Sequence, residues 1–168
     1  QAILYAAGLE NVSGQVPTQR VDVINMSLGG GGFSSSEASA ITAARDAGVI
    51  IVAAAGNSGS ANQEYPASYD GVVSVAAINQ SNTRTSYSNF GQSIDITAPG
   101  GDLDEDADGN GTPDGVLSTI GNDRESSTTY GYRYYQGTSM SSPHVAGVAA
   151  LMKSVAPNMT PAEFDKVL

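Results

Sequence analysis

The sequence has 168 residues, of which 40% are hydrophobic and 14% are charged, as is typical of one globular domain with a buried core. Its net charge of −10, from 17 acidic and 7 basic residues, argues against nucleic acid as a partner, because phosphate neutralisation requires Lys and Arg. The absence of Cys excludes disulfides and thiolate metal sites, and no apolar run is long enough to predict a membrane span.

Helical and extended patterns alternate along the chain. We expect a helix over residues 1–9, a second over 34–47 that begins with a capping-box pair of Ser34 and Glu37, and a third that starts near Ser139. Four strands are expected between them, over residues 21–26, 49–53, 72–78 and 93–96. The second strand is apolar throughout, as is typical of a strand buried on both faces. This order predicts an α/β fold, a three-layer sandwich with a mainly parallel sheet between helices.

Two loops follow the first two expected strands, at residues 27–30 and 54–57. Ligands of parallel α/β sheets gather at the carboxyl ends of the strands. We therefore expect both loops to line one site, together with Ser139.

Residues 137–147 read GTSMSSPHVAG and place Ser139 at the start of an apolar helical run. The backbone N–H groups of a first helical turn lack partners and the helix dipole is positive there, so an oxyanion beside Ser139 would be stabilised. Pro143 is expected in the first turn, where its missing N–H costs nothing. From the residues alone, Ser139 is either a nucleophile or an ordinary serine N-cap.

Three motifs in one order, INMSLGG at 24–30, AAAGNSG at 53–59 and GTSMSSPHVAG at 137–147, resemble the subtilisin-like serine peptidases. The resemblance covers essentially all 168 residues and corresponds to the later part of the catalytic domain, so the fold is expected to be subtilisin-like but incomplete. It implies that Ser139 is the nucleophile and that Asn57 is the side-chain donor of the oxyanion hole. Without it, Asn57 would be read as a turn residue. The family also implies a secreted, bacterial enzyme.

The same resemblance implies a substrate cleft. Residues 27–29 would bind the substrate backbone as an added strand, and residues 54–56 would form one wall of the pocket for the residue before the scissile bond. Their small side chains leave room for a large one. The substrate-binding residues implied are Ser27, Leu28, Gly29, Ala54, Ala55, Gly56 and Thr138. The segment Tyr65–Pro66 resembles one in which the bond before proline can be cis.

A serine peptidase needs a base, and the sequence has one histidine. His144 lies five residues after Ser139 and points about 140° away around the helix, so it is not expected to reach the Ser139 hydroxyl; the resemblance gives it a structural role. The family's motifs for the catalytic Asp and His do not occur here. We expect them upstream of Gln1 in a longer protein, we expect this chain alone to be inactive, and we expect exposed apolar sheet surface that pairs with the missing N-terminal half or with itself.

Six acidic residues lie between Gly101 and Gly115, with no basic residue among them. Their spacing fits the first nine positions of an EF-hand-like calcium loop that starts at Asp106 and has Gly111 at its sixth position. The ligands expected for structural calcium in residues 101–115 are Asp106, Asp108, Asn110, the carbonyl of Thr112, and Asp114. A register that starts at Asp104 is the weaker alternative, and a solvated acidic loop is the other reading. Leu117 at position 12 excludes a full EF-hand, so Asp102 or Asp104 would have to complete the shell.

The sequence therefore predicts a serine endopeptidase that forms an acyl-enzyme on Ser139, with its base supplied by upstream sequence. The alternative is a non-catalytic, calcium-stabilised domain of the same family that binds a polypeptide or a partner. The presence or absence of the upstream Asp and His motifs distinguishes the two.

Overall fold

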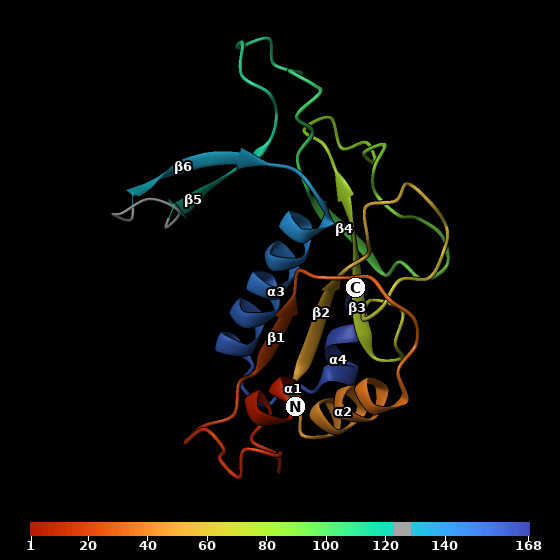
Figure 1. Cartoon of the computed structure of the whole chain (residues 1–168), viewed down its shortest axis with the longest axis vertical. Helices are drawn as coiled ribbons and strands as arrows, with labels where there is room; N and C mark the ends of the chain where they lie inside the picture. The colour runs from red at the N-terminus through yellow and green to blue at the C-terminus, as the bar shows by residue number, and fades with distance from the viewer. Residues whose placement is uncertain (123–128) are drawn as a thin grey trace.

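The computed structural model describes residues 1–122 and 129–168. Its main sheet has four parallel strands in the order β1-β2-β3-β4 (Figure 1). Their bounds are β1 Val23–Met26, β2 Ile50–Ala54, β3 Val72–Ile78 and β4 Ile96–Pro99. The first three lie where the sequence predicts them. The fourth begins at Ile96, three residues after its predicted start, because a turn closed by the Ile94 N–H and the Gly91 carbonyl precedes it.

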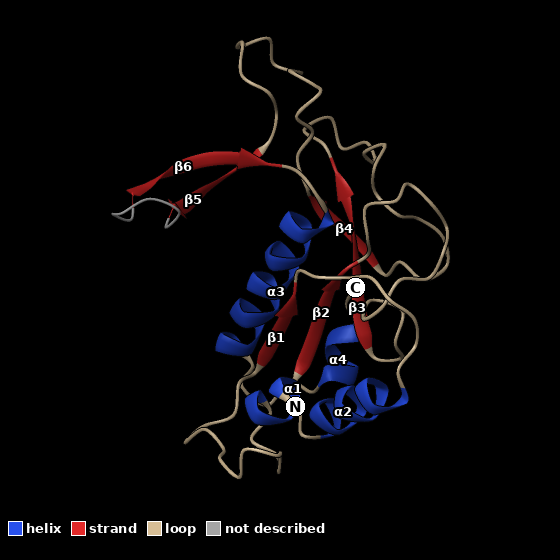
Figure 2. Cartoon of the chain, viewed as in Figure 1, coloured by secondary structure: helices blue, strands red, loops and turns tan. Residues whose placement is uncertain are grey.

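Helices cover both faces of this sheet (Figure 2). Helix α3 (Thr138–Val155) packs across all four strands on one face, and α1 (Ala2–Ala6) and α2 (Ser35–Asp46) lie on the other. The short helix α4 (Pro161–Asp165) adds buried Phe164 to the α3 side. Alternate residues of β2 point into the two cores, which explains why all five are buried. The predicted three-layer α/β arrangement is confirmed.

The predicted capping box of α2 forms only in part. The Ser34 hydroxyl accepts from the Glu37 N–H, but the Glu37 carboxylate does not reach back. It accepts instead from the Tyr69 hydroxyl at 2.8 Å, and the Ser34 N–H donates to that same hydroxyl. A buried tyrosine therefore replaces half of the box. Burial raises the pKa of Tyr69, which keeps its hydroxyl protonated.

A two-stranded antiparallel hairpin, β5 (Val116–Asn122) and β6 (Thr129–Tyr135), was not expected from the sequence. It projects away from the sheet and α3 (Figure 1). Most of its residues are exposed, although Tyr130, Tyr132 and Tyr134 alternate along β6 with Gly131 and Arg133, a period-two pattern that indicates a strand.

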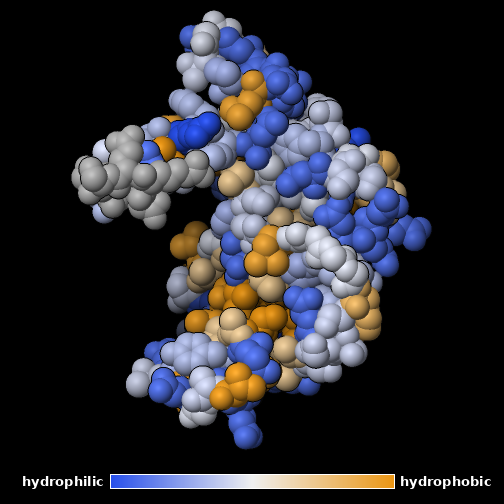
Figure 3. Space-filling model, viewed as in Figure 1, coloured by the Kyte–Doolittle hydropathy of each residue, from blue (hydrophilic) through white to orange (hydrophobic). Residues whose placement is uncertain are grey.

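Apolar surface is exposed along one side of the main sheet. Strand β1 forms the sheet edge, and a groove of about 900 Å³ beside it is bordered by Ile24 and Met26 and by residues of α1 and α2. Figure 3 shows apolar side chains gathered over this region. On α3, Leu151 and Val155 are also exposed. Within the described residues, no helix is long and apolar enough to cross a membrane.

Candidate active site

Ser139 is the second residue of α3 and lies against the end of β1. Its hydroxyl donates to the Ser27 carbonyl at 3.3 Å, and the Ser27 hydroxyl donates to the Ser139 carbonyl at 2.8 Å. Gly137, two residues before Ser139, is the N-cap of α3 and has φ +142°, a conformation that favours glycine. The first helical turn therefore begins directly beside a strand end, as expected for this serine.

Pro143 lies in the second turn of α3, not in the first as predicted, because the helix begins at Thr138. Its missing N–H would have donated to the Ser139 carbonyl four residues earlier. That carbonyl accepts from the Ser27 hydroxyl instead. Pro143 thus frees an acceptor that joins the serine to β1.

Asn57, at the end of the loop after β2, is anchored through its oxygen. Its Oδ1 accepts from the Thr138 N–H at 2.8 Å and from the Thr138 hydroxyl at 3.0 Å. Thr138 is fully buried, and its hydroxyl also accepts from the Gly56 N–H at 3.1 Å. With the oxygen held by two donors, the orientation of the amide is fixed, and a Cβ on Gly137 would lie 3.6 Å from its Nδ2 and 3.7 Å from its Oδ1. Asn57 is exposed and borders the same small pocket as Ser139, so its Nδ2 remains available as a donor there.

A second set of polar side chains, which the sequence reasoning missed, holds Ser27 in place. The Ser142 hydroxyl donates to Asn25 Oδ1 at 2.6 Å, and Asn25 Nδ2 donates to the Ser27 hydroxyl at 2.9 Å. Asn25 lies in β1 and Ser142 in α3, within two of the recognised motifs, so their placement there was the available signal. Hydrogen bonds therefore join the end of β1 to the start of α3.

Tyr87 supports the same helix start from the other side. Its hydroxyl donates to the Gly101 carbonyl at 2.6 Å and accepts from the Gly137 N–H at 3.1 Å. Burial raises the pKa of Tyr87, so the hydroxyl stays protonated and both bonds persist at neutral pH. It connects Gly137 to the first residues of the acidic loop.

A small pocket of about 80 Å³ lies between the two strand ends and borders Ser139. It is lined by Leu28, Gly29, Ala54, Gly56, Asn57, Glu64, Thr138 and Ser139. Most of the residues predicted to bind substrate therefore meet in one place. Ala55 does not line it: this residue is buried behind the wall, and its carbonyl accepts from Asn89 Nδ2 at 2.9 Å.

The pocket differs from the prediction in size and charge. Small residues of the wall were expected to leave room for a large side chain, but the carboxylate of Glu64 occupies part of that room. Glu64 stands directly before the cis bond between Tyr65 and Pro66, seven residues after Asn57. Glu64 directly precedes the segment Tyr65–Pro66, which resembles one of the family, and this position was the signal that could have identified it.

His144 is exposed and engaged with its own helix. Its Nδ1 lies 2.7 Å from the Met140 carbonyl. Ser139 and His144 both border a groove of about 290 Å³ between α3 and the start of β5. The one histidine of the sequence thus borders the same groove as the serine, although five helical residues place the two about 140° apart, and its Nδ1 is engaged by the Met140 carbonyl.

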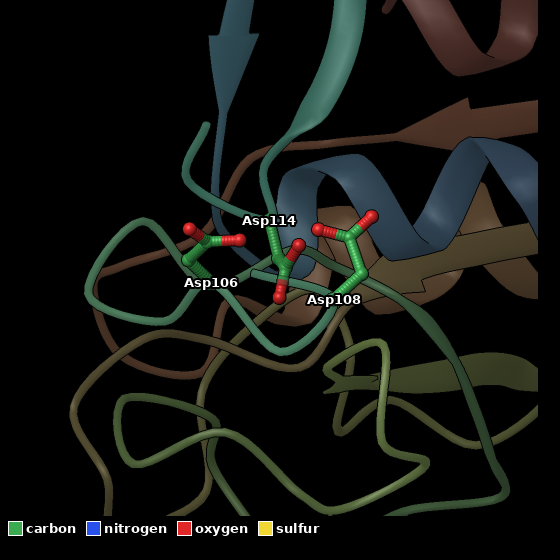
Figure 4. A group of neighbouring side chains, drawn as sticks. All are labelled: Asp106, Asp108 and Asp114. Atoms are coloured by element: carbon green, nitrogen blue, oxygen red, sulfur yellow. The ribbon is translucent and has the colours of Figure 1, made fainter. Parts of the chain in front are cut away.

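In the acidic loop, Asp106, Asp108 and Asp114 converge (Figure 4). One carboxylate oxygen of each lies within 4.8 Å of the others. The N–H of Asn110 donates to Asp108 at 3.0 Å and lowers the pKa of that carboxyl, with smaller contributions from neighbouring side chains. The N–H of Gly111 donates to Asp106 at 2.8 Å. The Asp108 carboxylate is therefore held in its charged form.

The side chain of Asn110, predicted as a further ligand, is engaged within the loop, and the carbonyl of Thr112 stays a prediction. The Asn110 Oδ1 accepts from the Thr112 N–H at 2.8 Å, and its Nδ2 donates to Asp108 at 2.7 Å. The amide oxygen is therefore used within the loop. Asp102, which was considered to complete the shell, accepts from the Asp104 N–H, and neither belongs to the three-carboxylate group among the described residues.

Comparison with known proteins places these features in a family. The model of the subtilase family matches residues 1–168. An extracellular protease of Xanthomonas campestris pv. campestris is 42% identical over 99% of this chain and 27% of its own length. Subtilisin amylosacchariticus of Bacillus subtilis subsp. amylosacchariticus is 38% identical over 87% of the chain and 34% of its own length.

Solved structures of other proteases are also similar to this chain. A protease of Pseudoalteromonas arctica matches with a TM-score of 0.89 and 42% identity, over 99% of this chain and 48% of that one. A cold-adapted subtilisin-like serine proteinase matches with a TM-score of 0.67 and 35% identity, over 87% of this chain and 46% of that one. The chain thus spans less than half of each of these proteins, and it belongs to the subtilase family.

Proposed function

We propose that this chain carries the nucleophile, the oxyanion site and part of the substrate cleft of a secreted bacterial serine endopeptidase. The observation that carries the proposal is the pairing of Ser139, at the start of α3, with an Asn57 whose oxygen is fixed by Thr138. That pairing supplies a nucleophile and an aimed donor side by side, which a domain that only binds polypeptide would not need. The names of its extracellular relatives support secretion.

The chemistry follows from these positions. Ser139 Oγ bonds to the carbonyl carbon of the scissile peptide while its proton passes to a base, and the carbonyl oxygen becomes an oxyanion. The Asn57 amide and the Ser139 N–H stabilise that oxyanion. When the carbon–nitrogen bond breaks, the proton goes to the leaving amine and an acyl-enzyme remains on Ser139. Water then hydrolyses the ester and restores the hydroxyl.

The base must come from outside this chain. His144 is the one histidine, and its Nδ1 is directed to the Met140 carbonyl. The Ser139 hydroxyl donates to the Ser27 carbonyl, a bond that a base would have to replace. We infer that upstream sequence supplies the His and Asp, and that this chain without it has only the residual activity of binding and oxyanion stabilisation, about 10³ to 10⁴ over water.

We infer that the same upstream sequence covers the exposed apolar surface beside β1. An unpaired edge of a parallel sheet and a neighbouring apolar groove are both unfavourable in water. Pairing with the missing part of the domain would bury them. In its absence, self-association of the chain is the expected substitute.

We also propose that residues 101–115 bind structural calcium, through Asp106, Asp108 and Asp114. Calcium–oxygen distances of about 2.3–2.6 Å put two ligands on opposite sides of the ion roughly 4.6–5.2 Å apart. The 4.8 Å limit on the separation of these carboxylate oxygens fits that span. Three negative charges so close repel one another unless a cation lies between them. The ion would hold the loop, with no part in the reaction.

Activity of the complete protease with S139A tests the proposed function. Loss of peptide hydrolysis to the residual level is expected, because the nucleophile is gone. S141A is the matched control, since Ser141 lies two residues further along α3 with a buried hydroxyl that has no partner among the described residues. Activity of S139A close to that of S141A would exclude Ser139 as the nucleophile.

A further inference from the structure

The pocket beside Ser139 contains a single charged side chain, that of Glu64. Glu64 comes from the loop between β2 and β3, and it is partly exposed. Among the described residues it forms no ion pair with Lys or Arg. A carboxylate that borders the nucleophile and has no cation of its own is free to select what enters the pocket.

One oxygen of Glu64 is fixed by the protein. Its Oε1 accepts from the Ser58 hydroxyl at 2.7 Å and from Asn89 Nδ2 at 3.1 Å. Asn89 is buried, and it is itself held by the N–H groups of Ser58 and Ser60 and by the Ala55 carbonyl. The carboxylate therefore has a set orientation, because its anchor Asn89 is itself held by the loop that follows β2.

The other oxygen of Glu64 faces the pocket. A Cβ on Gly56 would collide with Oε2, and one on Gly29 would lie 3.6 Å from it. These glycines follow β2 and β1, so Oε2 lies in the space between the two strand ends. Gly56 has φ +105°, and a side chain there would both be strained and displace the carboxylate.

We propose that Glu64 makes this pocket select a basic side chain, lysine before arginine, at the residue preceding the scissile bond. The inference rests on the proposed function, and it adds the substrate class. A lysine ammonium is a point charge that can pair with Oε2 alone. Arginine binds carboxylates best through two parallel bonds, but Oε1 is already engaged by Ser58 and Asn89.

Size and overall charge support the same choice. The pocket of about 80 Å³ corresponds to roughly five to eight water-sized groups at about 10–15 Å³ each. That room suits the slender stem and single ammonium of lysine better than a broad aromatic ring. The net charge of −10 also favours the approach of basic polypeptides.

The test compares two peptides cleaved by the complete protease, identical except for lysine or norleucine before the scissile bond. Norleucine keeps the unbranched stem and lacks the ammonium. Because a hydrogen bond to a charged group is strong when partly desolvated, we expect kcat/KM for lysine to exceed that for norleucine by about 10- to 100-fold. In E64Q, which keeps an acceptor for Ser58 and Asn89, the ratio should fall to near one, because the lysine ammonium loses its charged partner.

E10Q is the matched control, since Glu10 is exposed and distant in sequence, and its removal changes the net charge equally. A wild-type ratio near one overturns the proposal without any variant, and so does a high ratio that survives in E64Q. If neither peptide is cleaved and Ser139 does not react with a fluorophosphonate, the proposed function fails, and this inference fails with it. Cleavage after norleucine alone overturns the choice of substrate while leaving the peptidase intact.

Discussion

Ser139 lies among residues drawn from four distant parts of the chain, whereas the acidic loop takes all three of its converging carboxylates from residues 106–114. The first site is held by neutral hydrogen bonds between strand ends, a loop and a helix start. The second is held by backbone N–H groups of the loop itself. Long-range neutral contacts leave the Ser139 site formed before any ligand arrives, but local contacts leave three like charges together, which the proposed calcium ion would balance.

The largest effect is expected on kcat, from a substitution that disrupts the preorganised Ser139 site. N57A removes the side-chain donor, and loss of one such donor costs about 10²- to 10³-fold in kcat, or about 2.7–4 kcal/mol. KM should change little, because the donor acts on the oxyanion and not on the bound substrate. Steady-state kinetics of the complete protease measure this. N62A, on an exposed position of the same loop, should behave as wild type; equal losses in both variants would point to a loop effect.

Removal of calcium should act on the other site. Calcium at 100 times its Kd would contribute about 2.7 kcal/mol of stability, so a chelator should lower the Tm by several degrees. D108N should show the lower Tm already and respond little to chelator, because one of three carboxylates is missing. D70N, at an exposed acid elsewhere, is the control. A chelator shift equal in D108N and wild type would show that calcium binds elsewhere.

A smaller effect is expected from the anchor of Asn57. T138V keeps the shape of a fully buried side chain but removes the hydroxyl that bonds Asn57 and Gly56. It leaves the Gly56 N–H without its acceptor, so we expect a loss of about 1–3 kcal/mol in the free energy of unfolding and a several-fold lower kcat. T138S should restore both. A kcat unchanged in T138V would mean that the Thr138 N–H alone fixes the amide.

The smallest effect is expected on the stability of the acidic loop at low pH. The Asn110 N–H holds the pKa of Asp108 below its ordinary value of 3.8, so the charged form is favoured in the folded protein. This contribution is present above pH 3.8 and is lost as the pH falls through the lowered pKa. In chelator, the Tm of wild type should therefore fall more steeply below that pH than the Tm of D108N. Parallel curves would show that Asp108 does not contribute.

The sequence predicted the parts of this fold that bury apolar residues. Strand β2 is apolar at every position, and α2 has a serine N-cap and a closing glycine, so both were expected. The hairpin of β5 and β6 was missed although Tyr130, Tyr132 and Tyr134 alternate along β6, because most of its residues are exposed and it is not part of the buried sheet. Strand β4 was misplaced because its start depends on a turn at Gly91.

The residues of the candidate site likewise fall into those that the sequence predicted and those that it missed. Ser139, Asn57 and Thr138 were predicted because they lie within contiguous motifs. Glu64 and Tyr87 were missed because their roles depend on partners brought together only by the fold: Asn89 is 25 residues from Glu64, and Gly137 is 50 residues from Tyr87. Pro143 was placed in the wrong turn because α3 begins at Thr138, and the Ser27 hydroxyl that bonds the carbonyl left free by its missing N–H is 112 residues from Ser139.

The most direct test of the central claim is to react the complete protease with a fluorophosphonate and to find the modified serine by fragmentation mass spectrometry. Ser139 should carry one adduct per molecule, with Ser141 and Ser142 unmodified, and N57A should label more slowly because the phosphonyl oxygen loses its donor. An adduct on Ser141 or Ser142, or no adduct in an active preparation, would contradict the assignment of Ser139 as a nucleophile preorganised by Asn57 and Thr138.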